Sequence, residues 1–190
     1  MSRQRFVEMA RDAIIALPQD LKTALRLVED PDLEDICRKR VAGAILHVLS
    51  ASNAIPGARG TLQHVGDILL LRIVLQRARE SCDGWRDAYL ADPSDLLASL
   101  DSELEVAKAF LGRGFEVLES AAEGVESLVH HGHSAAACVE DEESSNWLYD
   151  EVQEAIVERF EFDEDDVARE LKEIDRIAGA LLARATSAGA

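Results

Sequence analysis

Two pairs of glutamates are the residues whose types and spacing best fit metal chemistry. Glu151 and Glu154 form one pair, and Glu170 and Glu173 form the other. Because residues three apart share one face of a helix, each pair can present two carboxylates together. On adjacent helices, the four groups could hold Mg²⁺ with several waters, which a nucleoside triphosphate would then bridge.

These pairs are similar in spacing to those of the all-α nucleoside-triphosphate pyrophosphatases, which use ExxE and ExxD pairs on adjacent helices. The same spacing recurs at Glu123/Glu126 and Glu140/Glu143, and no Lys or Arg cluster for phosphate lies nearby. The pairs also flank apolar helix positions, where solvated charges usually sit. We therefore rank a hydrolase second and expect no catalytic residue, no metal and no cofactor, with Mg²⁺ only under that alternative.

The other candidate ligands gather in one segment. They are His130, His131, His133, Cys138 and the acids of 140–143. A zinc site needs three or four ligands held at about 2.0–2.3 Å in a fixed geometry. Adjacent histidines at a helix end, followed by an exposed loop over 131–145, do not supply that geometry, and histidine there also complements the helix dipole. We expect a solvated loop.

Single histidines and cysteines elsewhere have simpler interpretations. His47 and His64 lie on helices that should pack together, so we expect them to be buried and hydrogen-bonded. Cys37, Cys82 and Cys138 are odd in number, far apart and outside any CxxC, which argues against a disulfide framework or a thiolate zinc site. The sequence also lacks GxxxxGKS/T, GxGxxG, HExxH and GxSxG, and no Glu-x-x-His pair is available for a di-iron site.

One segment, LHVLSASNAIPGARGTLQHVGDILLL (46–71), resembles the YkvA-like family, a bacterial domain of unknown function. The resemblance covers about residues 31–78. Matching positions are Leu49, Ser50, Ile55, Pro56, Asp67 and 68–71; departures are Ala51, Asn53, Gly57 and Gly66, where the family has proline or acids. The resemblance implies a helical hairpin and no particular activity, with Asn53, Ile55, Pro56 and Asp67 as the family-motif positions.

The elements that position these residues are predicted to be helices throughout. The apolar residues are rich in Ala and Leu and poor in aromatics, which favours helices over strands. Pro18 should end the first helix, Asp30 and Pro31 should begin the third, and Thr61 should cap the fourth. Helical spacing predicts helices over 3–17, 21–28, 31–51, 62–75, 94–130, 146–160 and 164–186, with breaks at Asp83–Gly84 and Asp92–Pro93.

Four of these segments define the expected architecture. The 62–75 helix is apolar nearly all round and should be buried centrally. The 94–130 segment keeps a heptad-type seam that includes Leu104, Leu111 and Leu118, which predicts one long helix. The two C-terminal helices should form an antiparallel hairpin. We predict an all-α, irregular helical bundle of about seven helices around the long central helix.

Charge divides the chain into two parts. Residues 1–90 have a net charge of +1, whereas 91–190 have a net charge of −18. We expect an N-terminal helical part and an acidic C-terminal part, packed as a single body. A surface this acidic repels nucleic-acid phosphate, so we expect no nucleic-acid partner. The most apolar segments are too short to span a bilayer, so we expect no membrane span.

The leading hypothesis is therefore a non-enzymatic helical interaction protein, such as an adaptor, regulator or assembly factor. Its partner would be a protein, for example a basic one, and the seam could also form a homodimer. The start of the chain has no apolar stretch typical of a signal peptide, so we expect a cytoplasmic protein. The excess of Arg (16) over Lys (4) favours a bacterial source.

Overall fold

The computed structural model describes residues 2–50, 52, 54–55, 57–82, 85 and 95–188, and nearly all of them are helical. In chain order the elements are α1 (Ser2–Glu29), α2 (Asp35–Leu49), α3 (Thr61–Ser81), α5 (Asp95–Leu111), η1 (Gly112–Gly114), α6 (Phe115–Glu123), η2 (Val125–Ser127), β1 (Val129–His130), β2 (His133–Ser134), α7 (Ala137–Glu140), α8 (Glu142–Glu158), α9 (Glu164–Glu170), η3 (Leu171–Glu173) and α10 (Asp175–Ala188). The all-α helical bundle is confirmed. The breaks predicted at Asp83–Gly84 and Asp92–Pro93 lie outside the described residues.

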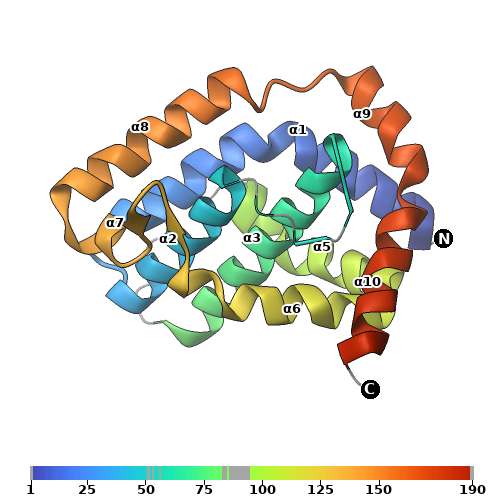
Figure 1. The fold of residues 1–190 in the computed structure, drawn as a ribbon, viewed down its shortest axis with the longest axis horizontal. Helices are drawn as coiled ribbons and strands as arrows, with labels where there is room; N and C mark the ends of the chain where they lie inside the picture. Colours follow the sequence, from blue (N-terminus) through green and yellow to red (C-terminus); the bar gives the residue numbers. More distant parts are fainter. Residues whose placement is uncertain are drawn as a thin grey trace.

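Helix α3 is the centre of the bundle. Every residue from His64 to Leu75 is buried, as the apolar run predicted. Helices α1, α2, α5 and α6 all pack against it, and Figure 1 shows it in the middle of the molecule. A buried helix of this kind fixes the positions of the few polar residues that it carries, because its neighbours enclose it on all sides.

The N-terminal helices differ from prediction in two ways. Pro18 does not end the first helix, because α1 continues through it to Glu29. Leu17 and Leu21, on either side of Pro18, are fully buried, so packing offsets the roughly 3 kcal/mol that an internal proline costs. The next helix begins at Asp35 and not at Pro31. Asp30 instead accepts a hydrogen bond from the Asp32 N–H (2.9 Å) within the preceding turn.

The long helix predicted over 94–130 is broken. Helix α5 ends at Leu111, and Gly112 has φ +53°, a left-handed conformation that ends an α-helix. Two residues later, Gly114 lets α10 come close, since a Cβ there would lie 2.9 Å from the Leu181 Cβ. The seam leucines at 104, 111 and 118 are nevertheless buried. The spacing therefore predicted the buried face correctly but missed the bend.

The predicted C-terminal hairpin does not form. Helix α8 packs on α7, α1 and α2, whereas α10 packs on η1, α6 and α5. Figure 1 shows α8 along the top of the molecule, with α9 and α10 descending its right side. The connection contains Phe160, which is buried, and Phe162, which is partly buried. These aromatics attach the connection to the body, so the chain continues around the bundle and does not fold back on α8.

Ion pairs join the two differently charged parts of the chain. Across the described residues, six of them link a cation before residue 90 to an acid after it: Arg3–Asp175, Lys39–Glu140, Arg40–Glu126, Arg72–Glu103, Arg77–Glu123 and Arg79–Asp101. The charge difference seen in the sequence is thus partly matched inside one molecule. Among the described residues, no helix combines the length and apolar character needed to cross a membrane.

Candidate functional site

Three polar residues are buried together between α2 and α3. His47 comes from α2, while His64 and Asp67 lie one turn apart on α3, so that both face the same neighbour. The Asp67 carboxylate lies between the two rings. Its Oδ1 is 3.5 Å from His47 Nε2, and its Oδ2 is hydrogen-bonded to His64 Nδ1 at 3.2 Å. We call this group the His–Asp–His cluster.

Aromatic and aliphatic residues close over the His–Asp–His cluster. The ring of His64 makes edge contacts with Phe160 (5.5 Å between centroids) and Phe162 (5.3 Å). Beside them, the Arg159 guanidinium donates a hydrogen bond to the Leu49 carbonyl at the end of α2 (2.8 Å). Ile55 is fully buried and packs against α3. The connection after α8 therefore shields the cluster from water, and the Asp67 side chain is only 4% exposed.

Burial shapes the acid–base chemistry of this cluster. It raises the pKa of Asp67, against the opposing effects of the His64 hydrogen bond and the nearby His47 and Arg159. Burial also lowers the pKa of His47, while the charge of Asp67 opposes that change. His47 Nε2 has no hydrogen-bond partner within the described part of the chain. The arrangement can share or transfer a proton between a carboxyl and an imidazole.

The prediction of two buried histidines is confirmed, but the expected hydrogen bond is found only for His64, because His47 Nε2 has no hydrogen-bond partner among the described residues. Both histidines lie on helices that pack together. Of the family-motif positions, Asp67 belongs to the cluster and Ile55 packs against Gly66, whereas Asn53 and Pro56 are outside the described residues. The sequence analysis did not predict that the Asp67 carboxylate lies between the rings of His47 and His64. The available signal was a lone Asp67 inside an apolar run.

The four glutamates of the predicted pairs are placed apart. Glu170 caps α3, because its carboxylate accepts a hydrogen bond from the Thr61 N–H at 2.7 Å. Thr61 is thus the first residue of α3 and not its cap. Glu173 forms an ion pair with Arg176, and Glu154 is exposed on α8. Because α8 and α9 do not form a hairpin, no three of these carboxylates gather among the described residues.

The histidine segment is ordered, which corrects the expected loop over 131–145. Strands β1 and β2 form a small antiparallel hairpin, and α7 and the start of α8 follow. His133 stacks on Trp147 (4.2 Å between centroids, 9° between planes) and lies 3.0 Å from the Ser144 hydroxyl. Cys138 is buried, which raises the pKa of its thiol to about 11. That thiol is therefore a poor metal ligand or nucleophile at neutral pH.

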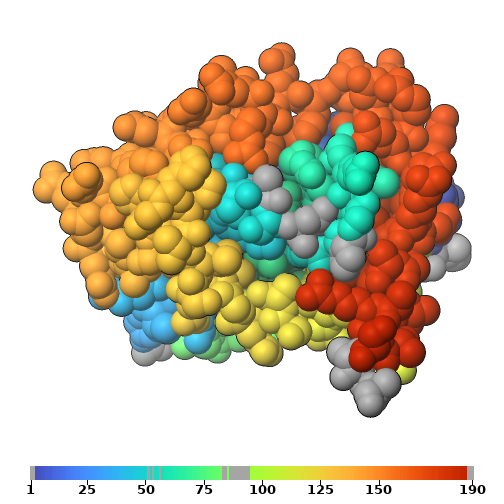
Figure 2. All heavy atoms as spheres, in the orientation of Figure 1, coloured from blue at the N-terminus to red at the C-terminus, as the bar shows by residue number. Residues whose placement is uncertain are grey.

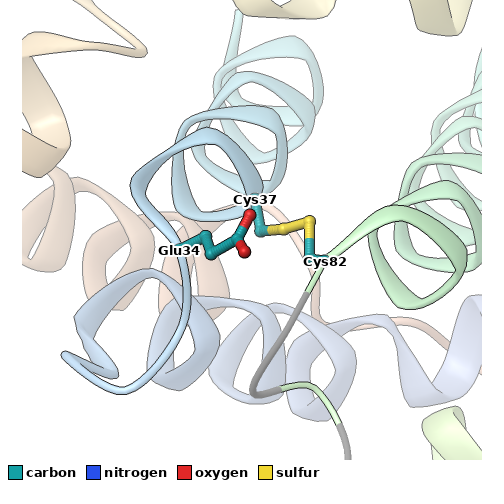
Figure 3. A group of neighbouring side chains, drawn as sticks. All are labelled: Glu34, Cys37 and Cys82. Carbon is teal, nitrogen blue, oxygen red and sulfur yellow. A yellow bond between two sulfur atoms is a disulfide. The ribbon is translucent and has the colours of Figure 1, made fainter.

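The remaining cysteines correct the prediction of no disulfide. Cys37 at the start of α2 is bonded to Cys82 just after α3, with 6.3 Å between their Cα atoms (Figure 3). Glu34 lies beside them. Antiparallel packing of α2 and α3 brings together residues 45 positions apart, so distance along the sequence was no guide. In this oxidised form neither sulfur is available as a thiolate ligand.

Comparison with known proteins gives no family for this chain. No protein-family model matches it, and no curated protein and no solved structure is similar to it. The resemblance of residues 31–78 to the YkvA-like family therefore stays a prediction. The helical hairpin that it implies is present as α2 and α3, but helical hairpins are too common to identify a family.

Proposed function

We propose that this protein is a non-enzymatic helical interaction protein, an adaptor, regulator or assembly factor, that binds a basic segment of a partner protein along α8. The observation that carries the proposal is the charge of the outward side of α8. Its exposed acids are Glu142, Glu143, Asp150, Glu154 and Glu158. Within the described residues, none of them forms an ion pair, whereas Asp101 and Glu103 of α5 and Glu123 of α6 are paired with arginines.

Exposed apolar side chains lie on the same side of α8. Tyr149 is 47% exposed and Val157 is 74% exposed. At about 100° per residue, 149, 150, 153, 154, 157 and 158 fall on one half of the helix surface. Figure 2 shows α8 and α9 along the upper edge of the molecule. Unpaired acids beside apolar side chains fit a partner helix that carries both basic and apolar residues.

The same charge supports the rest of the proposal. A partner is a protein and not a nucleic acid, because phosphate is repelled by a net charge of −17. We also propose a bacterial, cytoplasmic protein. The Cys37–Cys82 bond counts against that location, since structural disulfides are rare in a reducing compartment. Alkylation of the thiols in intact cells tests this point: two free thiols at these positions support a cytoplasmic location, and a protected pair contradicts it.

The second hypothesis, a Mg²⁺-dependent nucleotide hydrolase, gains no support from the geometry. Its four glutamates do not gather, and Glu170 is engaged with the backbone of α3. A homodimer through the seam is also not favoured, because Leu104, Leu111 and Leu118 are buried within the chain itself. Sedimentation at several concentrations would show whether another surface forms a dimer.

The test uses a labelled helical peptide with Leu on one face and Lys on the other, and measures its binding by fluorescence anisotropy. We expect affinity to fall at least tenfold in a variant with Asp150→Asn, Glu154→Gln and Glu158→Gln. The control variant carries Glu29→Gln, Glu105→Gln and Glu116→Gln, which change the net charge equally at exposed positions elsewhere. If both triple variants weaken binding equally, the affinity is non-specific and the proposed surface is wrong.

A further inference from the structure

A second cluster of potential ligands lies at the hairpin beside α8, and the proposed partner surface does not account for it. One nitrogen of His130, one nitrogen of His131 and one carboxylate oxygen of Glu151 all lie within 4.8 Å of one another. His130 and Glu151 are partly buried, and His131 is exposed. The cluster is therefore held in place by its two partly buried residues and is open to solvent at His131.

The backbone of the hairpin brings the two rings together. His131 has φ +48° and Gly132 has φ +90°, which is the conformation of a tight two-residue turn between β1 and β2. A positive φ is uncommon for a residue other than glycine, and histidine is among the residues that adopt it most readily. The turn stacks the His131 ring on the His130 ring, with 4.0 Å between centroids and 23° between planes. Adjacent histidines, which would alternate sides on a regular strand, thus point the same way.

We propose that His130, His131 and Glu151 bind a divalent transition-metal ion of the Zn²⁺ class. Two imidazoles and one carboxylate are a ligand set that zinc uses when a fourth position stays open to water. Bonds of about 2.0–2.2 Å would place tetrahedral donors roughly 3.4 Å apart. Because the observed atoms lie within 4.8 Å of one another and the two rings are stacked, a bound ion would draw the side chains closer and tilt the rings apart.

Neighbouring residues with the same chemistry are excluded as ligands by their contacts. His133 stacks flat on Trp147 and lies within hydrogen-bond distance of Ser144. Glu154, three residues after Glu151, is exposed and belongs to no group of ligands within the described chain. These two residues provide matched controls, one histidine and one glutamate.

The first experiment is a calorimetric titration of the untagged full-length protein with ZnCl₂. We expect one ion per chain, and affinity at least tenfold weaker in Glu151→Gln and in His131→Asn. Asparagine tolerates the left-handed conformation at position 131, so this variant should keep the hairpin. Glu154→Gln and His133→Asn should bind as the wild type does. Equal affinity in all four variants, or equal losses in the controls, would overturn the site.

A second readout does not depend on mutating the ligands. The Trp147 ring centroid is 6.0 Å from that of His130 and 6.3 Å from that of His131. A paramagnetic ion such as Co²⁺ in this site should quench Trp147 fluorescence, and added Zn²⁺ should restore it by displacement. Trp147→Phe should abolish the quenching, which leaves Trp85 as the internal reference. Quenching of the same amplitude in Trp147→Phe, or none in the wild type, would contradict the proposal.

Discussion

Asp20 and Asp67 are both buried carboxylates, but the fold balances them differently. Asp20, on α1, lies 3.1 Å from the Arg72 guanidinium, which also binds Glu103. Asp67 lies instead between two histidines. A guanidinium keeps its charge at every accessible pH, whereas an imidazole titrates near neutrality. The Arg72 cluster, which joins α1, α3 and α5, is therefore a brace with a fixed cation, whereas the partners of Asp67 are not fixed cations.

The largest expected effect comes from breaking the fixed brace. Arg72→Met should lower the free energy of unfolding by about 3–5 kcal/mol, because it leaves Asp20 buried without its cation. Urea unfolding followed by circular dichroism measures the change. Arg79→Met is the control, since the Arg79–Asp101 pair lies at the surface and should contribute about 1 kcal/mol or less. Equal costs for the two variants would mean that Arg72 is no brace.

Apolar packing beside the brace should be nearly as sensitive. Leu104, next to Glu103, and Leu111 are buried at the inner face of α5. Leu104→Ala or Leu111→Ala should cost about 2–5 kcal/mol in thermal or urea unfolding, as buried leucines do. Lys108→Ala should stay within about 0.5 kcal/mol, because Lys108 is half exposed. Wild-type stability in both leucine variants would contradict the packing of α5.

Asp20 and His47 should give opposite pH dependences, whereas the raised pKa of Asp67 acts in the same direction as that of Asp20. Burial raises the pKa of Asp20 to about 6, so folding favours its protonated form, and stability should fall as pH rises from about 4 to 6. The lowered pKa of His47 favours the neutral ring, so stability should fall as pH drops below about 6.5.

The free energy of unfolding of the wild type should therefore fall by an amount on the order of 2–3 kcal/mol between pH 4 and 6, and Asp20→Asn should abolish this fall. His47→Gln should instead remove the fall in stability that the wild type shows as pH drops below about 6.5. Urea midpoints measured every half pH unit compare the two variants with the wild type. If both variants change the pH profile in the same direction, the contrast between Asp20 and His47 is wrong.

How much of this could be predicted from sequence differs between fold and site. The apolar run 62–75 correctly predicted a central helix, and Asp67 and Arg72 within that run were the visible sign of buried polar clusters. Their partners were not visible, because Asp20 and His47 come from other helices, and sequence spacing carries no information on which helices pack together. The bend at Gly112 was hidden for a related reason. A heptad pattern reports which residues face the core, and both sides of the bend face the same core.

The smallest effect should come from removing the charge at Asp67 while keeping its shape. Asp67→Asn retains an oxygen for the His64 hydrogen bond. It also removes a negative charge whose burial is unfavourable. We expect a cost of about 1 kcal/mol in urea unfolding, against about 2–3 kcal/mol for Asp67→Ala, which leaves both histidines without a polar partner. If Asp67→Asn costs as much as Arg72→Met, then the charge of Asp67 is itself a brace, and the two buried carboxylates have the same structural role.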